Sequence, residues 1–146
     1  MNAMTFSNPD NSAIKAYLKD VRRIAVLGLS PNPSRPSHQI ARSLQRFGFE
    51  IVPVRPAVTE VLGEQAYPSL HEVPGQIDLV DVFRASQHVP EIVDQCLQLG
   101  IPAIWLQDGV IAPQAAERAR TEGMFVVMDD CLGRFLHQQQ WPLAKR

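Results

Sequence analysis

The chain has 146 residues, of which 45% are hydrophobic, so it is long enough for one domain with a full core. Its formal net charge of −1 excludes a general attraction to nucleic acid or to a membrane surface. The two cysteines lie in separate segments and predict neither a disulfide framework nor a metal site, which suits a reducing cytoplasm. No apolar run approaches the roughly 20 residues of a membrane span, and we expect no signal peptide.

Short β-rich runs alternate along the chain with amphipathic segments, which is typical of a parallel sheet covered by helices on both faces. The pattern predicts a first helix with Asn11 or Ser12 as its N-cap, and a second one for which Ser37 is a suitable N-cap. A third helix ends at Gly100, a fourth begins at Pro113, and a last one is expected at residues 132–140. The runs predict five strands, at residues 23–27, 51–54, 79–83, 103–106 and 125–128.

The stretch at residues 59–74 contains two prolines and is predicted to be a loop with a short helical turn at residues 69–72. Right-handed crossovers then suggest a doubly wound five-stranded sheet of order 3-2-1-4-5 in three layers. The switch point of this order lies between the first and fourth strands. The whole chain, residues 1–146, is expected to be one domain with its core at about residues 14–136.

Three arginines follow the first three predicted strands: Arg35, Arg55 and Arg84. In an open parallel α/β sheet, ligands bind at the carboxyl ends of the strands. Guanidinium groups that converge on this edge favour an anion with several phosphates. Because the net charge of the chain is close to zero, the arginines indicate a local site.

The loop after the first strand, residues 28–37, lies where a dinucleotide-binding fold keeps its glycine-rich phosphate turn. Only Gly28 remains of the G-x-G-x-x-G spacing, so this is not the NAD fingerprint. Three prolines stiffen the loop, Arg35 adds a planar donor, and the next helix begins with free amides. We therefore predict phosphate binding here. The alternative is a solvated loop in which Ser37 only caps the following helix. The loop's other candidate contacts are Leu29 and the hydroxyls of Ser30, Ser34 and Ser37.

After the second strand, an NAD-binding fold needs an acidic residue for the ribose, but this chain has Val54, Arg55 and Pro56. A cation in this place favours a ribose that carries its own phosphate, as in NADP or coenzyme A. The alternative is that Arg55 is an ordinary surface charge. Phe83 and Arg84 after the third strand suit an adenine or a pyrophosphate.

The last two strand ends offer Gln107, which can bind a polar uncharged part of a ligand, and Gly109, which permits close approach of the backbone. Cys131 lies at a probable helix start, where the pKa of a thiol can be lowered. It is either a buried spectator or a reactive thiol that forms a mixed disulfide with coenzyme A. Asp81, inside the third strand, is interpreted as structural and directed at a helix N-terminus. The four histidines show no metal spacing.

Taken in order, seven motifs resemble the small bacterial CoA-binding proteins, which are stand-alone relatives of the CoA-binding domain of the succinyl-CoA synthetase α subunit. The resemblance implies a Rossmann-like fold with coenzyme A at the strand ends, the phosphates in the first loop and the adenosine near the second strand. This chain departs from the family pattern at Arg55, where Asn is common, and at Leu132, where Pro is common. The motifs are GLSPNPSRPS (28–37), VPVRP (52–56), VLG (61–63), YPSL (67–70), DLVDVFR (78–84), WLQDG (105–109) and VMDDC (127–131).

Three functions are compatible with these observations. The first is a CoA-binding or acyl-CoA-binding module without catalysis, acting as a carrier, a sensor or a regulatory subunit, with a protein partner possible. The second is an NADP-dependent oxidoreductase or another nucleotide-binding enzyme, for which the chain has no substrate domain and no well-placed proton donor. The third, a cysteine-dependent phosphatase, ranks last because Cys131 and Arg134 are too close in sequence to form an anion-cradling loop.

Overall fold

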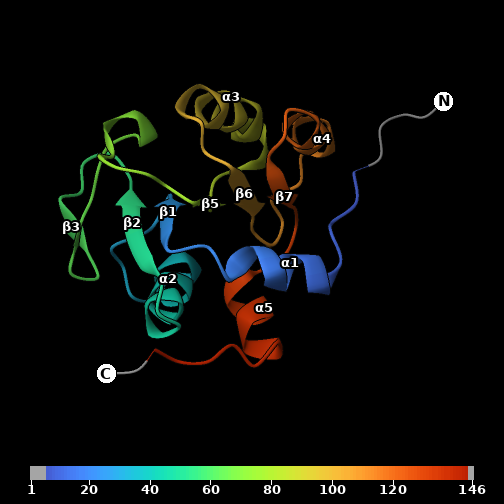
Figure 1. Cartoon of the computed structure of the whole chain (residues 1–146). Coiled ribbons are helices and arrows are strands. Elements are labelled where there is room, and N and C mark those ends of the chain that lie inside the picture. The colour runs from blue at the N-terminus through green and yellow to red at the C-terminus, as the bar shows by residue number, and fades with distance from the viewer. Residues whose placement is uncertain (1–5, 145–146) are drawn as a thin grey trace.

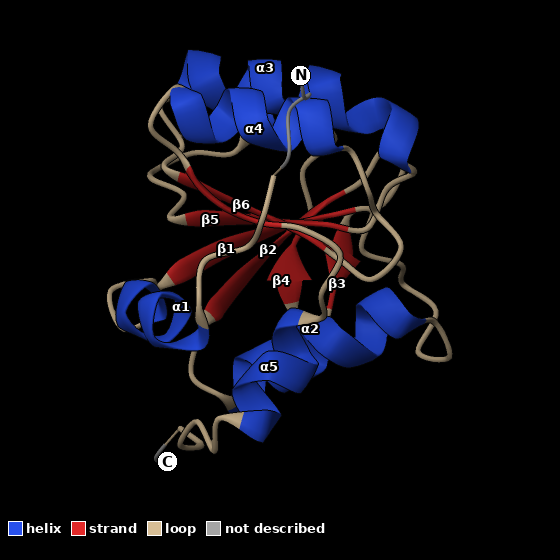
Figure 2. Ribbon diagram, turned by 90° about the vertical axis from the view of Figure 1, so that its right-hand side faces the viewer, coloured by secondary structure: helices blue, strands red, loops and turns tan. Residues whose placement is uncertain are grey.

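The computed structural model describes residues 6–144, which form a three-layer α/β sandwich (Figures 1 and 2). The helices α1 (Asn11–Leu18), α2 (Pro36–Arg46) and α5 (Leu132–Gln138) cover one face of the sheet. The other face carries α3 (Val89–Leu99) and α4 (Pro113–Thr121). The predicted Rossmann-like, doubly wound class is confirmed. The parallel sheet consists of β1 (Arg23–Leu27), β2 (Glu50–Val54), β5 (Leu79–Val82), β6 (Ala103–Leu106) and β7 (Phe125–Val127).

The strand order is β2-β1-β5-β6-β7, so the predicted order, which placed the third strand outside the second, is wrong. β5 pairs with β1, and the switch point lies between these two strands. The physical reason is visible in β2, where Pro53 lacks an N–H group and so suits an edge strand. The Pro53 carbonyl faces outward and accepts a hydrogen bond from Tyr67 N–H at 3.0 Å, which covers this edge with a single bridge.

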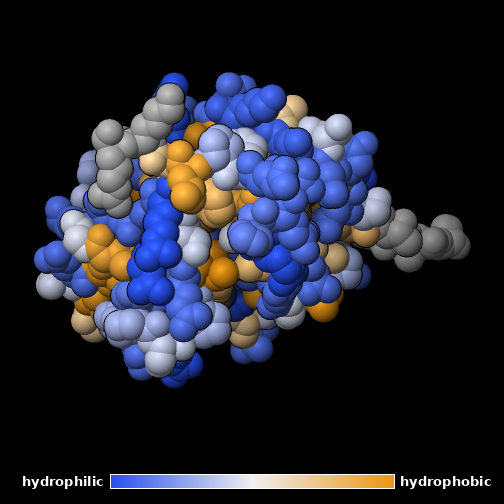
Figure 3. All heavy atoms as spheres, turned by 90° about the horizontal axis from the view of Figure 1, so that it is seen from below, coloured by the Kyte–Doolittle hydropathy of each residue, from blue (hydrophilic) through white to orange (hydrophobic). Residues whose placement is uncertain are grey.

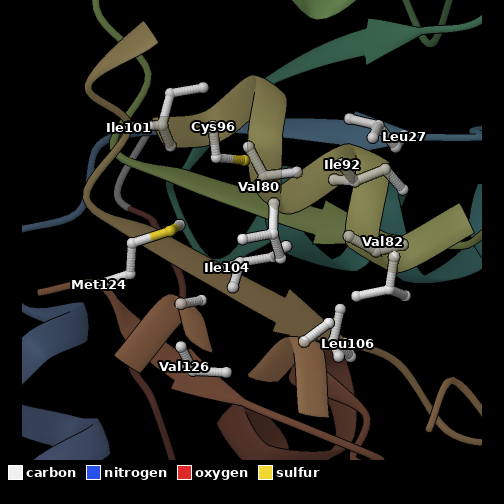
Figure 4. Packing of buried hydrophobic residues seen from close by; sticks show 14 of the residues in the cluster. Leu27, Val80, Val82, Ile92, Cys96, Ile101, Ile104, Leu106, Met124 and Val126 are labelled. Carbon is white, nitrogen blue, oxygen red and sulfur yellow. The ribbon is translucent and has the colours of Figure 1, made fainter. Parts of the chain in front are cut away.

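Alternate residues of the strands fill two hydrophobic clusters, one on each face of the sheet. Val80, Val82 and Ile104 point toward α3 and α4, where they pack with Ile92 and Cys96 (Figure 4). Leu79 and Trp105 point the other way, toward α1, α2 and α5. Each fully buried aliphatic side chain stabilises the fold by about 1.5–3 kcal/mol, so these clusters hold the strand ends in fixed positions.

Local capping differs from the prediction at two helices. Asp10 caps α1, because its carboxylate accepts a hydrogen bond from Ala13 N–H at 2.8 Å, so neither Asn11 nor Ser12 is the N-cap. α2 begins at Pro36, with Arg35 in the N-cap position and no side-chain cap. Ser37 is therefore inside the helix, and its predicted role as N-cap is wrong.

The predicted loop at residues 59–74 contains a small antiparallel hairpin of β3 (Glu60–Val61) and β4 (Glu64–Gln65). Its predicted helical turn is confirmed as the 3-10 helix η1 (Leu70–Glu72). A second 3-10 turn, η2 (Ser86–His88), precedes α3. The last helix ends at Gln138, two residues earlier than expected. Within residues 6–144, no helix is long and apolar enough to span a membrane.

Candidate functional site

A cavity of about 690 Å³ opens at the carboxyl edge of the sheet. Every strand of the sheet contributes to its lining, because a residue that follows each strand faces it: Gly28, Arg55, Phe83, Gln107 and Cys131. α2 adds its first turn. The position agrees with the rule that ligands of doubly wound folds bind at this edge, near the switch point.

Most of the residues predicted for the site lie together in this cavity, but four do not line it. Leu29 and Val54 are buried in the core, and Pro56 and Gly109 are exposed next to the cavity. The predicted residues that line it are Gly28, Ser30, Arg35, Ser37, Arg55, Phe83, Arg84, Gln107 and Cys131, and the additional ones are Pro36, Ile40, Asp108 and Val110.

Gly28 forms the floor of the cavity and brings two strands close together. Its φ of 80° lies in the left-handed region, and a Cβ atom at this position would meet the Phe83 carbonyl oxygen at 2.5 Å. The Gly28 N–H continues the ladder to β2 by donating to the Val54 carbonyl at 3.0 Å. Only glycine allows the loop after β1 to leave the sheet so close to β5.

The loop after β1 is held by its own polar groups. Ser30 N–H donates to Ser37 Oγ at 3.0 Å, and the Ser30 carbonyl lies 2.9 Å from His38 Nδ1. Asn32 binds both the Ser34 backbone and the Ser34 hydroxyl through its Oδ1 at 2.9 Å. Ser37 thus closes the loop with its oxygen, which leaves its hydroxyl proton free to donate into the cavity.

His38 is a structural residue of the site that sequence reasoning missed. Its side chain is only 7% exposed, and its contact with the Ser30 carbonyl fixes the start of the loop. Ile40, also missed, lies two residues further along α2 and gives the cavity an apolar wall. One signal in the sequence could have indicated both residues. They lie in the first two turns of a helix that follows a phosphate-type loop.

Arg35, Arg55 and Arg84 reach the same cavity, and none of them forms an ion pair within residues 6–144. Arg35 and Arg84 are exposed, whereas Arg55 is half-buried and donates weakly to the Gly28 carbonyl at 3.4 Å. The uncapped N-terminus of α2 adds a further partial positive charge. This half of the cavity can therefore bind several anionic groups at once.

Asp81 is fully buried in β5 and lies beneath the cavity. Its Oδ1 accepts a hydrogen bond from Gln107 Nε2 at 2.5 Å, whereas its Oδ2 has no partner within the described residues. Burial raises the pKa of Asp81 to about 7, and the hydrogen bond from Gln107 opposes this shift. Asp81 was predicted to be structural and to face a helix N-terminus. The predicted partner is wrong, because Asp81 accepts its hydrogen bond from the Gln107 amide.

Cys131 lines the cavity but is only 7% exposed, and it is the N-cap of α5, where its sulfur accepts from Arg134 N–H at 3.4 Å. Burial raises the pKa of the thiol and outweighs the lowering influence of that hydrogen bond. Burial therefore outweighs the lowering that a helix start can cause, which favours the spectator thiol over the reactive one, and the thiol form prevails at neutral pH.

Asp108 lines the cavity after β6 and is paired with Arg134 of α5. Arg134 donates to both Asp108 oxygens, at 2.8 and 2.9 Å, and to Asp130 at 2.8 Å. These contacts hold the pKa of Asp108 below its usual range. Arg134 is therefore committed to contacts within the protein.

The fold and the cavity define a doubly wound protein with an arginine-lined cavity at the carboxyl edge of its sheet. Residues 22–137 match the family described as "CoA binding domain", and the chain belongs to this family. It is 40% identical to the uncharacterized protein YneT of Bacillus subtilis over 125 residues, which is 86% of this chain and 93% of that protein. This relative confirms the family resemblance seen in the sequence.

A solved structure from Thermus thermophilus, cell-free ID.343, is similar to the whole fold, with a TM-score of 0.82 and 35% sequence identity. The alignment covers 90% of this chain and 98% of that one. The chain is also 26% identical, over 80% of its length, to the α subunit of an ADP-forming acetate–CoA ligase of Pyrococcus furiosus. It matches only 28% of that subunit, so it is similar to one part of a larger enzyme.

Proposed function

We propose that this protein binds coenzyme A or an acyl-CoA in the carboxyl-edge cavity, without catalysis, as a carrier, a sensor or a regulatory module. The observation that carries the proposal is the convergence of Arg35, Arg55 and Arg84, all without an ion-pair partner in the described structure. Coenzyme A has a diphosphate and a separate ribose phosphate, so it offers anionic groups at two places. Membership of the CoA-binding family supports this ligand.

Within this proposal, the loop after β1 and the first turn of α2 bind the diphosphate. Arg35, Ser30 and Ser37 surround this place, and backbone amides at the start of α2 add donors. Arg55, at the end of β2, then contacts the ribose phosphate, while Phe83 offers an aromatic face beside Arg84. Ile40 and Cys131 remain for the thiol arm.

The absence of catalysis is proposed from the chemistry of the lining residues. The cavity lining contains no histidine or lysine. Its carboxylate, Asp108, has a lowered pKa and is bound to Arg134, and its thiol, Cys131, has a raised pKa. Neither group is prepared to accept a proton or to attack a substrate at neutral pH. The similarity to part of an acetate–CoA ligase subunit also agrees with a module that binds and does not react.

Native mass spectrometry of freshly purified protein, followed by calorimetry, tests the proposal. We expect CoA to bind, and dephospho-CoA to bind about 10- to 150-fold more weakly, because one charge-assisted hydrogen bond contributes about 1.5–3 kcal/mol. Equal affinities for both would remove the role of Arg55 at the ribose phosphate. Binding of NADP in place of CoA would favour the oxidoreductase alternative, and the proposal would be wrong.

A further inference from the structure

A second hollow adjoins the cavity. It is a groove of about 420 Å³ between α2 and α5, and Ile40 and Cys131 line both spaces. Arg35, Arg55 and Arg84 line the cavity and not the groove. A ligand that occupies the cavity therefore meets the lining of the groove at Ile40 and Cys131.

At one end of the groove, α2 and α5 approach each other closely, because Gly133 of α5 faces Ile40 of α2. A Cβ atom added at Gly133 would meet the Cδ1 atom of Ile40 at 3.1 Å and the Cys131 sulfur at 4.0 Å. Any larger residue at Gly133 would therefore press on the Ile40 side chain. The helices thus approach closely at Gly133, and the groove continues beside this contact along Ser43 and Phe47.

The C-terminal segment forms the far wall of the groove. Ala144 N–H donates to the Arg46 carbonyl at 2.8 Å, which fastens this segment to the end of α2. Leu143 lines the groove there and is 68% exposed, the most exposed large hydrophobic residue of the described chain. Apolar surface is visible between hydrophilic ridges on the face of the molecule that carries α1, α2 and α5 (Figure 3).

We infer that this groove, named here the α2–α5 groove, holds the aliphatic acyl group of a bound acyl-CoA. The inference rests on the proposed CoA site, because the thiol arm must end at Ile40 and Cys131 for its acyl group to enter. A chain of methylenes would cover Leu143, Phe47 and Ile40, which are the apolar lining residues. A groove of this volume suits a small ligand, and it shares Ile40 and Cys131 with the cavity that would hold the rest of the molecule.

The charges around the α2–α5 groove agree with a neutral chain that leaves toward solvent. Among the described residues, its lining contains no carboxylate side chain, and Arg134 is committed to Asp108 and Asp130. Arg46 and His137 are exposed, so their polar ends can stay in water while their stems contact the chain. The protein would then distinguish acyl-CoA from free CoA by burial of hydrocarbon alone.

Calorimetry with CoA, acetyl-CoA, butyryl-CoA, hexanoyl-CoA and octanoyl-CoA tests the inference. Burial of one methylene contributes about 0.8 kcal/mol, which corresponds to about three- to fourfold in affinity. Because the groove is open on one side, we expect an increase of about two- to fourfold per methylene from butyryl-CoA to octanoyl-CoA. Binding of CoA with no dependence on chain length would overturn this inference and leave the proposed function intact. Absence of binding by every member of the series would overturn both.

Variants of the groove separate the acyl group from the rest of the ligand. Ser43→Phe fills the groove, so octanoyl-CoA should bind no better than acetyl-CoA, while the affinity for CoA changes by less than about twofold. Leu143→Ala, an exposed change that leaves the fold intact, should weaken octanoyl-CoA at least about threefold. The control is Leu99→Ala, which removes another exposed leucine from α3 on the opposite face. A Ser43→Phe protein that folds, as judged by its melting curve, and still prefers octanoyl-CoA would contradict the inference, as would equal effects of the two leucine variants.

Discussion

The two halves of the carboxyl edge use arginine in opposite ways. At the ends of β1, β2 and β5, Arg35, Arg55 and Arg84 face the cavity without an ion-pair partner in the described structure. On the side of β6 and β7, Arg134 binds two carboxylates, Asp108 and Asp130. The first half presents free cations to a ligand, whereas the second is neutralised by the protein itself.

This difference shows which cations are available for function. Three guanidinium groups around one cavity repel one another, and none of the three forms an ion pair within residues 6–144. An anion that enters the first half therefore gains interactions that the protein does not supply to itself. Under the proposed function, this pairing would confine the ligand's charged groups to the first half, and Gln107 and Cys131 would contact its uncharged part.

Two glycines, one in each half, give the largest expected effect. Gly28 and Gly109 both have a φ of 80°, but only at Gly28 would a Cβ atom meet the backbone, at 2.5 Å from the Phe83 oxygen. Gly109→Ala should cost about 1–2 kcal/mol in the free energy of unfolding, from conformation alone. Gly28→Ala should cost about 2–5 kcal/mol, because a steric clash is added. Urea denaturation of both variants measures the difference, and equal losses would show that β1 and β5 do not need their close approach.

Asp81 lies at the boundary of the two halves and should make stability depend on pH. Its pKa is raised in the folded state from 3.8 to about 7, so the native protein holds a proton that the unfolded chain releases. Stability from this group is fully present below about pH 4 and is lost as the pH rises to about 7. The loss is at most about 4 kcal/mol.

Asp81→Asn removes this titration and keeps an acceptor for Gln107. The variant should therefore gain stability relative to the wild type as the pH rises from 4 to 8. Unfolding curves at several pH values give this difference directly. Parallel profiles for the two proteins would mean that Asp81 titrates normally and that the folded state does not raise its pKa.

Arg134→Ala would remove the cation that neutralises Asp108 and Asp130 in the paired half. Because the ion pairs of Arg134 are largely exposed, the free energy of unfolding should fall by less than about 1 kcal/mol. The pKa of Asp108 should return upward toward its usual range, which NMR titration of the carboxyl carbon can follow. An unchanged pKa for Asp108 would show that Arg134 does not control the charge of this half.

The effect of Ser37→Ala should be confined to the loop of the first half. The Ser30 N–H group loses its acceptor, so we expect a loss of about 1 kcal/mol in stability and weaker CoA binding. Ser34→Ala is the control, because the Ser34 hydroxyl contacts Asn32 and does not line the cavity. Hydrogen exchange at Ser30 N–H reports the change, and equal protection in both variants would contradict the assignment of Ser37 as the residue that closes the loop.

Much of the fold follows from the sequence because burial and periodicity are local signals. The five strands and the helix stop at Gly100 were predicted within a few residues. The strand order was not, because a neighbour in a sheet is chosen by the whole fold, although Pro53 already indicated an edge. The hairpin at residues 60–65 was missed because its turn, Leu62-Gly63, has positive φ at a leucine, which sequence patterns do not suggest.

The candidate site was predicted well where position along a strand determines it, as for Arg55, Arg84 and Gln107. The site was predicted poorly where the packing of the core decides the direction of a side chain. Leu29 and Val54 neighbour the cavity in sequence, but their side chains face the core. Burial raises the pKa of the Cys131 thiol, and the hydrogen-bond partner of Asp81 is Gln107, which lies 26 residues further along the chain. Neither effect has a local sequence signal.

The central claim is that the unpaired arginines are reserved for the phosphates of the ligand, and calorimetric titration of CoA into three arginine variants tests it most directly. Arg35→Ala and Arg84→Ala should each weaken CoA about 10- to 150-fold with little loss of stability. Arg118→Ala removes an arginine that is paired with Asp94 away from the cavity, and it should change the affinity by less than about twofold. Equal CoA affinity in all three variants would contradict the claim.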